Sequence, residues 1–257
     1  MKGNGTEVLS SLSNPRLRRV RELLDRSRAR RKEDAFVVEG IRMFREIPDD
    51  RLVETFISEK FHEENPDVRG SVVKNEVFQK LSDTRTPQGV LAVVRQRHYT
   101  LPDLLQGEKG VWLVLEGIQD PGNLGTMIRT GEGAGISGII MDRNTADFYS
   151  PKTVRSTMGA VFRVPFFYTE DLAGTVREMK ESGITTYAAH LDGKEMYHEI
   201  SYADRTAFLI GNEGNGLSDE LTSLADVKLR IPMKGQVESL NAAISASLLM
   251  YRYMTGK

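Results

Sequence analysis

The sequence contains no cysteine, so disulfide bonds, thiolate zinc sites and cysteine nucleophiles are excluded. It also lacks long apolar runs: the longest, such as residues 111–115, span about five residues, whereas a membrane-spanning helix needs about 20. Residues 1–14 contain no apolar stretch behind a basic start, and nothing in them predicts export. We therefore expect a cytoplasmic protein that makes no contact with a membrane.

The net charge of −1 hides one strongly basic segment. Residues 16–32 (RLRRVRELLDRSRARRK) carry nine Arg or Lys against two acidic residues, a local charge of +7, which leaves −8 on the other 240 residues. A dense arginine cluster on a predicted helix suits a polyanion such as nucleic acid, because each neutralised phosphate releases counterions. The alternative is an ordinary solvated helix face.

The chain of 257 residues, 39% hydrophobic and 28% charged, is long enough for two folded domains. In the first half, apolar residues at helical spacing predict an amphipathic basic helix that ends near residue 30. Short strands then alternate with short helices, the strands at 35–39, 52–58, 70–73 and 90–95 and the helices at 40–47, 59–65 and 75–82. A small α/β domain is expected here. A polar linker at 96–110 places the boundary near residue 105, which gives domains of residues 1–105 and 106–257.

The second half alternates more regularly between the two kinds of element. Strands are predicted at 111–115, 138–141, 164–167, 184–189, 206–210 and 227–231, and helices at 121–134, 151–158, 170–182, 217–224 and 239–254. This alternation predicts a mostly parallel sheet covered on both faces. Ligands of such sheets gather where loops leave the carboxyl ends of the strands.

Three of these strand-to-helix loops are rich in glycine and polar residues, and they form the candidate site. We call them the first loop (EGIQDPGNLG, 116–125), the second loop (GNEGNGL, 211–217) and the third loop (PMKGQVESLN, 232–241). In the first loop Asp120 is placed to cap a helix that begins at Pro121. Each loop has a functional and a purely structural interpretation, and its own residues do not decide between them.

The helix that follows the first loop presents Gly122, Gly125 and Arg129 at spacings i, i+3 and i+7. A flank without side chains lets a ligand approach the backbone closely. Arg129 then projects with a permanent charge and a five-donor fork that suits phosphate. Tight helix packing with a surface arginine is the alternative.

In the second loop, Gly211, Gly214 and Gly216 follow a strand, which suggests backbone contact with a ligand. Their order matches neither GxGxxG nor GxxxxGK[ST], so the glycines could serve turns alone and Glu213 could be an ordinary exposed carboxylate. In the third loop, Ser239 is well placed to be the N-cap of the next helix. That helix is rich in Ala and Ser, which permits close packing against other elements or a second subunit.

Other catalytic arrangements have little support. The histidines lack HExxH spacing and there is no cysteine, so no metal site is expected; they are His62, His98, His190 and His198. No GxSxG segment indicates a serine hydrolase. The acidic residues cannot be paired from sequence, which leaves carboxylate acid/base chemistry unsupported.

Taken together, NLGTMIRTGEGAG (123–135), FLIGNEGNGL (208–217) and IPMKGQVESLNAAISASLLMY (231–251) resemble the three motifs of the SpoU, or TrmH, family of SPOUT RNA methyltransferases. The resemblance covers about residues 111–255, with the motifs in the family's order and spacing. Residues 14–47 also look like the N-terminal substrate-binding domain of many members. The pair Thr126-Met127 departs from the small or branched apolar residues common there, which can alter packing but leaves Asn123 and Arg129 in place.

This resemblance implies an α/β fold: a small N-terminal α/β RNA-binding domain and a C-terminal parallel-sheet α/β SPOUT methyltransferase domain with a deep trefoil knot. It implies methyl transfer from S-adenosyl-L-methionine to a ribose 2′-hydroxyl of structured RNA. By motif, the expected catalytic residues are Asn123, Arg129, Glu213, Ser239 and Asn241. The expected cofactor-binding residues are Gly211, Ile231, Met233 and Leu240.

The chemistry requires in-line alignment of the two substrates and stabilisation of a developing ribose oxyanion. A guanidinium is effectively always protonated in proteins, so we assign Arg129 to phosphate binding and electrostatic stabilisation instead of to proton abstraction. Glu213, Ser239 or an ordered water would then handle the proton. No metal is required.

The expected RNA contacts are Arg28, Arg30 and Arg31 in the basic segment, together with Arg129. The N-terminal domain favours rRNA over tRNA because it adds a docking surface for a large folded substrate, and tRNA remains the alternative. Two competing hypotheses are a non-catalytic RNA-binding protein on the same fold and a nucleotide-binding enzyme unrelated to RNA. The resemblance and the small-residue C-terminal helix together predict a homodimer.

Overall fold

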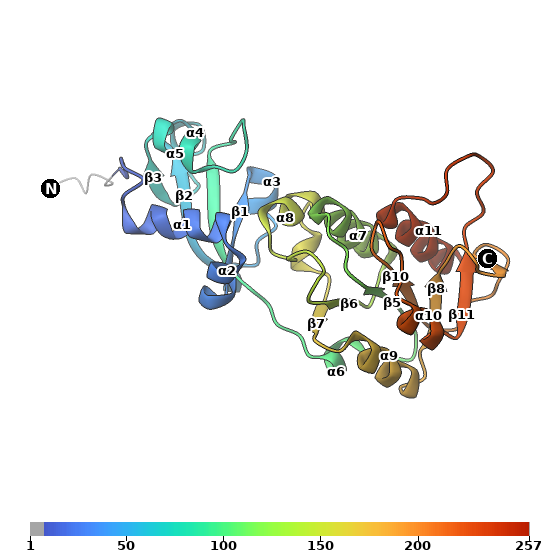
Figure 1. The fold of residues 1–257 in the computed structure, drawn as a ribbon. Coiled ribbons are helices and arrows are strands. Elements are labelled where there is room, and N and C mark those ends of the chain that lie inside the picture. The colour runs from blue at the N-terminus through green and yellow to red at the C-terminus, as the bar shows by residue number, and fades with distance from the viewer. Residues whose placement is uncertain (1–7, 257) are drawn as a thin grey trace, which may run out of the picture. The chain divides into compact units, whose positions relative to one another are not determined.

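The structure, a computed structural model, describes residues 8–256, which form two compact units (Figure 1). Unit 1 consists of residues 8–97 and 149–162, and unit 2 consists of residues 98–148 and 163–256. Of the N-terminal stretch in which we expected no export signal, residues 1–7 lie outside the described residues. Within the described chain, no helix is both long enough and apolar enough to cross a membrane.

Unit 1 is built on a four-stranded sheet in the order β1-β4-β2-β3. Strand β4 runs antiparallel to β1 and β2, whereas β2 and β3 are parallel. The strands are β1 (Ala35–Glu39), β2 (Leu52–Ser58), β3 (Ser71–Val73) and β4 (Val90–Arg95). The helices are α1 (Pro15–Asp25), α2 (Ser27–Glu33), α3 (Ile41–Phe44), α4 (Glu59–Glu64), α5 (Asn75–Leu81) and α8 (Pro151–Thr157), with 3₁₀ turns η1 (Asp49–Arg51) and η2 (Ala160–Phe162). These elements confirm the small α/β domain predicted from the first half.

The core of unit 1 lies on the two faces of this sheet. Apolar residues of α1 and α5 pack on one face, where Leu17, Leu23 and Phe56 are fully buried. A smaller cluster on the other face includes Ile57 and Phe61. Apolar positions recur along α1 at helical spacing, so one side of this arginine-rich helix is buried and the other is left for its charges.

The basic segment forms two helices, not the single helix that its spacing predicts. Helix α1 ends at Asp25, and Arg26 takes an extended conformation (φ −130°, ψ 117°) before α2 begins. The side chain of Arg30 folds back and donates hydrogen bonds to the carbonyl oxygens of Leu23 (2.7 Å) and Leu24 (3.1 Å). Because these carbonyls lie in the last turn of α1, Arg30 satisfies acceptors that the helix end leaves without partners.

One stretch from the second half of the chain, which we call the inserted segment (149–162), packs within unit 1. The ring of Tyr149 stacks on that of Phe36, with the ring centroids 4.4 Å apart. The buried guanidinium of Arg51 lies over the rings of both Phe36 and Phe162, at 5.9 and 5.5 Å from their centroids. The two units are therefore interleaved along the chain, which a boundary at a single position cannot describe.

Unit 2 is built on a seven-stranded, entirely parallel sheet in the order β7-β6-β5-β10-β8-β11-β9. Its strands are β5 (Gly110–Leu115), β6 (Gly138–Asp142), β7 (Phe166–Thr169), β8 (Thr185–Ala189), β9 (Glu195–Met196), β10 (Arg205–Ile210) and β11 (Val227–Arg230). Its helices are α6 (Leu101–Leu104), α7 (Pro121–Ala134), α9 (Leu172–Glu181), α10 (Asp219–Leu224) and α11 (Ala242–Thr255). The predicted parallel α/β sheet is confirmed. Among these strands, only β9, which has two residues and no detectable period, was not expected.

Helices cover both faces of this sheet, as Figure 1 shows: α7 and α11 lie on one face, α9 and α10 on the other. Strand β5 explains why both faces must be covered, since Trp112 and Val114 point to the α9 face and the alternate residues Val111 and Leu113 are equally buried. The three candidate loops follow β5, β10 and β11, so all of them leave the same edge of the sheet.

Candidate active site

The first and second loops are fixed to each other by side chain–backbone hydrogen bonds. The side-chain amide of Asn212 donates to the carbonyl oxygen of Gly117 (2.7 Å). In the opposite direction, the carboxylate of Glu116 accepts from the backbone N–H of Ser218 (2.8 Å). Because β5 and β10 are neighbours in the sheet, their two loops need only short side chains to join. The pair forms one rigid wall of the site.

Gly211 is required by the folding of the second loop itself. A Cβ atom at this position would lie 2.1 Å from the backbone carbonyl carbon of Gly216 and 2.1 Å from the backbone nitrogen of Leu217. No side chain fits at that distance from backbone atoms. The loop therefore closes on itself at Gly211, whereas a Cβ atom at Gly214 would meet only ordinary contacts. The packing of the loop therefore requires glycine at position 211 but not at position 214.

Glu213 of the second loop reaches across to the first loop. Its carboxylate accepts hydrogen bonds from the backbone N–H groups of Gln119 (3.0 Å) and Asp120 (3.2 Å) and from the side-chain amide of Asn123 (2.9 Å). Burial would raise the pKa of Glu213, but these hydrogen bonds outweigh burial, and its pKa is lowered from the ordinary value. Glu213 is thus an ionised carboxylate, and both of its oxygens accept hydrogen bonds from the first loop. An ordinary exposed carboxylate would have no such partners.

Asn123 extends this network to the third motif. Its side-chain oxygen accepts a hydrogen bond from the side-chain amide of Asn241 (2.9 Å). The side-chain oxygen of Asn241 in turn accepts from the backbone N–H groups of Ala243 (2.9 Å) and Ile244 (3.2 Å) at the start of α11. One chain of hydrogen bonds therefore runs from the first loop through Glu213 and Asn123 to the N-terminus of α11.

These contacts correct the local interpretation of Ser239. The residue that caps α11 is Asn241, because the helix begins at Ala242, three residues later than the sequence pattern predicts. Ser239 lies instead in the exposed third loop. No hydrogen bond ties residues 232–240 to the rest of the described chain, so the third loop is anchored at its carboxyl end through Asn241. At the first loop the structure confirms the predicted cap, since Asp120 accepts from the backbone N–H of Gly122.

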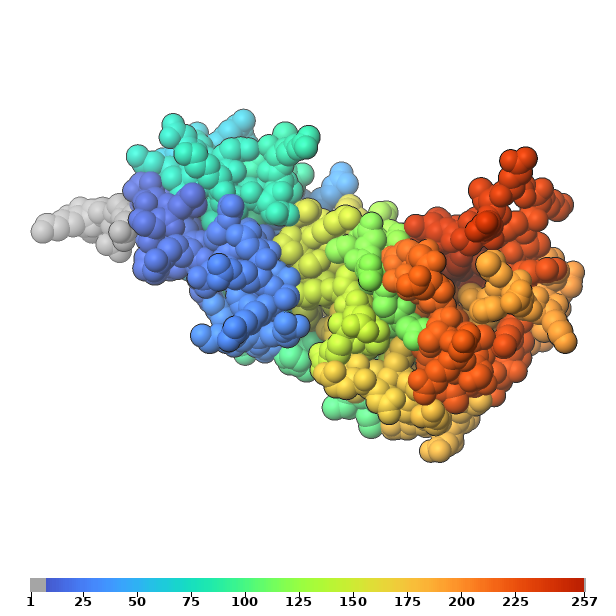
Figure 2. Space-filling model, viewed as in Figure 1, coloured from blue at the N-terminus to red at the C-terminus, as the bar shows by residue number. Residues whose placement is uncertain are grey.

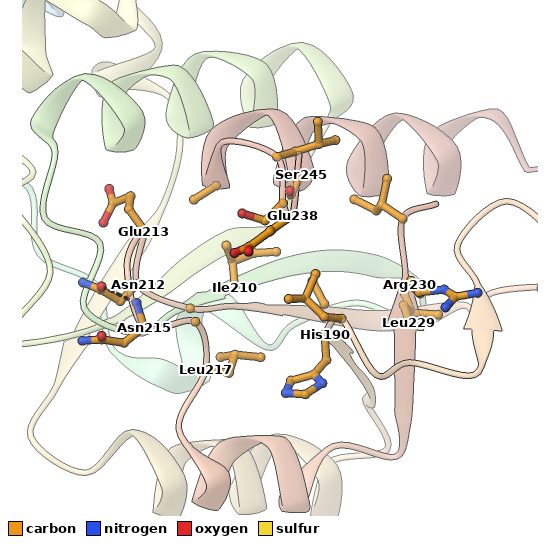
Figure 3. A pocket seen from close by; sticks show the side chains of 18 of the residues that line it. His190, Ile210, Asn212, Glu213, Asn215, Leu217, Leu229, Arg230, Glu238 and Ser245 are labelled. Atoms are coloured by element: carbon orange, nitrogen blue, oxygen red, sulfur yellow. Dashed lines mark hydrogen bonds between the residues drawn. The ribbon is translucent and has the colours of Figure 1, made fainter. Parts of the chain in front are cut away.

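A cavity of about 390 Å³ opens between the second loop, the third loop and the start of α11. In Figure 2 the residues coloured orange to red surround this hollow, and Figure 3 shows Asn212 and Glu213 on one side of it and His190 and Leu229 on the other. All four residues that the family resemblance assigns to the cofactor line it: Gly211, Ile231, Met233 and Leu240. Glu213 and Ser239 also line the cavity, so the structure brings most of the expected site together.

One part of the lining was not predicted from the sequence. Residues 189–192, which begin at the last residue of β8, form a further wall, although His190 was considered only as a metal ligand. Its ring Nδ1 accepts a hydrogen bond from the backbone N–H of Asp192 (3.2 Å), which leaves Nε2 to carry the proton in the neutral ring. The position of this segment after a central strand of a parallel sheet is the signal that could have found it.

Arg129 is not joined to the Asn123–Glu213 network. It lies on α7, its side chain is exposed, and it has no hydrogen-bond or ion-pair partner in the part of the chain that the structure describes. Gly133 lies one helical turn further along the same face, and a Cβ atom there would meet the hydroxyl of Tyr251 of α11 at 3.1 Å. Arg129 thus stands as a free cation beside the exposed side of α11.

The expected RNA-binding arginines of unit 1 differ in their surroundings. Arg28 and Arg31 are exposed on α2. Arg30 is only 5% exposed and holds the end of α1 through its guanidinium, so it is not part of the exposed charge and we drop it from the candidate RNA surface. Within residues 8–256, no group of three or more His, Asp or Glu side chains gathers at a spacing that could hold a metal.

Comparison with known proteins places this architecture in a family. Residues 110–251 match the SpoU rRNA Methylase family, and residues 14–92 match the MRM3-like substrate binding domain. The chain is 35% identical over 180 residues, 70% of each sequence, to the 23S rRNA (guanosine(2553)-2'-O)-methyltransferase RlmP of Bacillus subtilis (strain 168).

Two solved structures resemble almost the whole chain. An AdoMet-bound rRNA methyltransferase from Sinorhizobium meliloti superposes with a TM-score of 0.83, at 31% identity and with 97% of each chain covered. The SpoU methyltransferase AviRb from Streptomyces viridochromogenes, in complex with AdoMet, gives a TM-score of 0.82 at 26% identity, covering 94% of this chain and 97% of that one. The family match spans more than half of the chain and contains all three motifs, and the protein therefore belongs to the SpoU rRNA methylase family.

Proposed function

We propose that this protein transfers a methyl group from S-adenosyl-L-methionine to a ribose 2′-hydroxyl of structured RNA. The observation that carries the proposal is the hydrogen-bonded chain from Glu213 through Asn123 to Asn241, which joins the three motif loops beside one cavity. Three motifs far apart in sequence would not share a polar network at a cavity if each served only local turns. Their assembly favours a single catalytic site.

The cavity fits the proposed cofactor. Its lining combines apolar side chains, which suit a flat adenine ring, with exposed backbone of a glycine-rich loop, which suits polar edges. Gly211, Ile231, Met233 and Leu240 would hold the cofactor there. When bound, S-adenosyl-L-methionine supplies a methyl group that its sulfonium charge has already activated.

Glu213 has a positioning role in this proposal. Its pKa is lowered and its oxygens accept three hydrogen bonds, so it is a poor acceptor for the proton of the ribose hydroxyl. It fixes the orientation of Asn123 and of the first loop. Ser239, which is exposed at the cavity, or an ordered water is left to relay that proton to the solvent.

Arg129 is the proposed electrostatic group. Its guanidinium stays protonated and has no partner in the described chain, so it is available to pair with an RNA phosphate next to the reacting ribose. A fixed positive charge there would stabilise the negative charge that develops on the attacking oxygen. This role requires no movement of a proton to or from Arg129.

We favour rRNA as the substrate, and tRNA remains the alternative. The relative from Bacillus subtilis is named for 23S rRNA, and the N-terminal residues match a domain named for substrate binding. Arg28 and Arg31 supply exposed positive charge on α2, and the chain would act in the cytoplasm, where such RNA is found. A non-catalytic RNA-binding protein is a weaker alternative, because all five expected catalytic residues are present.

We further propose that the protein is a homodimer and that unit 2 contains the trefoil knot expected of the family. Helix α11 leaves three large apolar side chains 43–48% exposed at helical spacing: Ile244, Tyr251 and Met254. Such an apolar stripe on a helix suits a second copy of the same surface. Since Tyr251 lies beside the face of α7 that carries Arg129, a dimer through α11 would bring Arg129 close to the interface.

The decisive experiment is incubation of the protein with unmodified bacterial rRNA and with tRNA in the presence of methyl-labelled cofactor, followed by mapping of the modified ribose. Label on a ribose of 23S rRNA is the expected result. Label on tRNA alone would support the alternative substrate. RNA binding without transfer would indicate a non-catalytic protein, and calorimetry that detects ATP binding but no S-adenosyl-L-methionine binding would overturn the proposal.

A further inference from the structure

A buried carboxylate in unit 1, Glu39, has no part in the proposed chemistry. It ends strand β1 and is only 9% exposed. Its oxygens accept hydrogen bonds from the hydroxyl groups of Ser82 and Thr84 and from the backbone N–H of Asp83 (3.2 Å). A carboxylate in such a place is tolerated because these donors replace its hydration. Its effect is to hold the loop between α5 and β4 in one conformation.

A second brace fixes the same loop to the turn after β1. The side-chain oxygen of Gln88 accepts a hydrogen bond from the backbone N–H of Ile41 (3.0 Å). Gly40 makes this approach possible, because its φ of +94° disfavours other residues and a Cβ atom there would lie 2.9 Å from Gln88 Oε1. The segment 40–45, which contains α3, and the loop 82–88 therefore form one rigid surface, which we call the platform.

The platform carries unpaired positive charge. Arg42, Arg45 and Arg85 are exposed, and no hydrogen bond or ion pair involves their side chains within the described chain. The backbone N–H groups of Arg85 and Thr86 likewise have no partner there, and the hydroxyl-bearing Thr86 is exposed. Free guanidinium forks beside fixed backbone donors are the groups that bind phosphate oxygens.

The acidic groups at the platform do not cancel this charge. The carboxylate of Glu39 is buried beneath the loop, and that of Asp83 is paired with the guanidinium of Arg155 from α8 of the inserted segment. Glu46 lies at the other margin, where its side chain lies beside Gly159. The exposed top of the platform is thus basic, and one of its supports comes from the half of the chain that belongs to the catalytic family match.

The basic segment that the sequence singled out is, by contrast, partly used in folding. Arg16 and Arg19 pair with Glu54 and Glu33, and Arg21 pairs with Asp25 and donates to a backbone carbonyl. Its remaining exposed cations lie on α1 and α2 and at the junction between them: Arg18, Arg26, Arg28, Arg31 and Lys32. We assign them long-range attraction, whereas the cations of the platform lie beside a loop that Glu39 and Gln88 hold in place.

We infer that the platform, residues 40–45 and 82–88, is the surface through which unit 1 docks a structured RNA by its sugar–phosphate backbone. The inference rests on the proposed function, because it takes the partner to be the RNA substrate. A rigid array of arginine side chains, hydroxyls and backbone N–H groups recognises a fixed arrangement of phosphates and 2′-hydroxyls, which is how folded RNA differs from an extended strand. Base identity need not be read here.

The test is filter binding of an unmodified 23S rRNA transcript by the full-length protein at several KCl concentrations. The double variant R42E/R85E should bind at least ten-fold more weakly than the parent. The slope of log affinity against log salt should also become shallower by about 2, because two phosphate contacts are lost. The milder R42A/R85A should shift both quantities in the same direction.

A matched control separates docking from net charge. The double variant R69E/K74E makes the same charge change on unit 1, but these residues flank β3, at the opposite edge of the sheet from β1. It should bind the transcript nearly as well as the parent. Equal weakening by both double variants, or unchanged binding by R42E/R85E, would overturn the inference.

Calorimetry with S-adenosyl-L-methionine checks that the substitutions in unit 1 leave unit 2 folded. R42E/R85E should keep the cofactor affinity of the parent, which shows that unit 2 is intact. If the parent itself neither binds the transcript nor transfers methyl groups to RNA, the proposed function fails and the inference falls with it. If the parent does both and R42E/R85E matches it, the inference alone is wrong.

Discussion

The side-chain oxygen of Asn123 accepts a hydrogen bond from the side-chain amide of Asn241 at 2.9 Å, although 118 positions separate the two residues. This bond is the polar link between the first motif and the third. Asn241 uses its two side-chain atoms differently, because its oxygen caps α11 and its nitrogen reaches Asn123. The capping role and the linking role can therefore be separated by mutation.

Asn241→Asp should separate them. An aspartate keeps the N-cap, so the free energy of unfolding should stay close to that of the parent. It has no N–H to donate to Asn123 and adds a negative charge close to Glu213, so methyl transfer should fall by about ten-fold or more, as expected for loss of a charge-supported network. Urea unfolding and single-turnover methylation measure the two effects.

The control is Asn241→Ala, which removes both roles. It should lose about 1 kcal/mol of stability, the usual cost of deleting an N-cap, together with activity. If Asn241→Asp transfers methyl groups as fast as the parent, the link to Asn123 has no role in catalysis.

Glu213→Gln should reveal a pH-dependent contribution to stability. The pKa of Glu213 is lowered in the folded protein, so its carboxylate stabilises the fold above the pKa of an unfolded glutamate, about 4.3. That contribution is lost as the pH falls through the folded pKa. The difference in urea midpoint between parent and Glu213→Gln should therefore be constant near pH 7 and shrink below about pH 4. A difference that grows on acidification would contradict the lowered pKa.

Arg129→Ala should reduce turnover by about 100-fold or more, the usual worth of one preorganised oxyanion donor, while cofactor affinity survives. Arg129→Lys keeps the charge but loses the planar fork, and it should recover part of the activity with the parent's pH profile. A pH profile that shifts towards the titration of lysine would indicate a general base at position 129 and would contradict the electrostatic role.

Gly211→Ala and Gly214→Ala form a matched pair in the second loop. At Gly211 a Cβ atom would lie 2.1 Å from backbone atoms, so the loop must open and cofactor affinity should fall by at least ten-fold. At Gly214 the nearest atom, Asn212 Oδ1, is 3.5 Å away, and calorimetry should find the parent's affinity. Equal effects of the two substitutions would show that the loop needs flexible glycines and not a close approach.

Tyr251→Glu should produce a monomer if α11 forms the dimer interface. The substitution places a charge in the middle of the exposed apolar stripe of α11 and removes a large contact. Light scattering at micromolar concentration should report a dimer for the parent and a monomer of about 29 kDa for the variant. A monomeric parent would remove the basis for the dimer.

Sequence patterns predicted most of the fold because buried apolar residues recur with the period of the helix or strand that carries them. Strand β5 reads as an apolar run since both faces of the sheet are covered, and α7 is marked by the cap at Asp120. The break at Arg26 leaves no such record, because it depends on the side chain of Arg30 folding back onto α1. The two-residue strand β9 is too short to show any period.

The site could not be predicted from the residues of any one loop. Each loop was ambiguous alone, and only the joint resemblance to a family indicated that Asn123, Glu213 and Asn241 act together, a membership that the comparisons confirm. The contacts among them join residues 90 and 118 positions apart and depend on β5 and β10 being neighbours. The start of α11 was placed three residues early because Ser239 is an equally good cap by composition.

The inserted segment has a consequence for dissecting the molecule. A fragment that ends near residue 105 contains every strand of unit 1 but lacks Tyr149 and Phe162, which cover the ring of Phe36. Without them this fragment would expose a fully buried aromatic side chain and the cation of Arg51 that packs on it. Unit 1 is therefore encoded in two separate stretches of the chain, and it can be isolated intact only if both are kept.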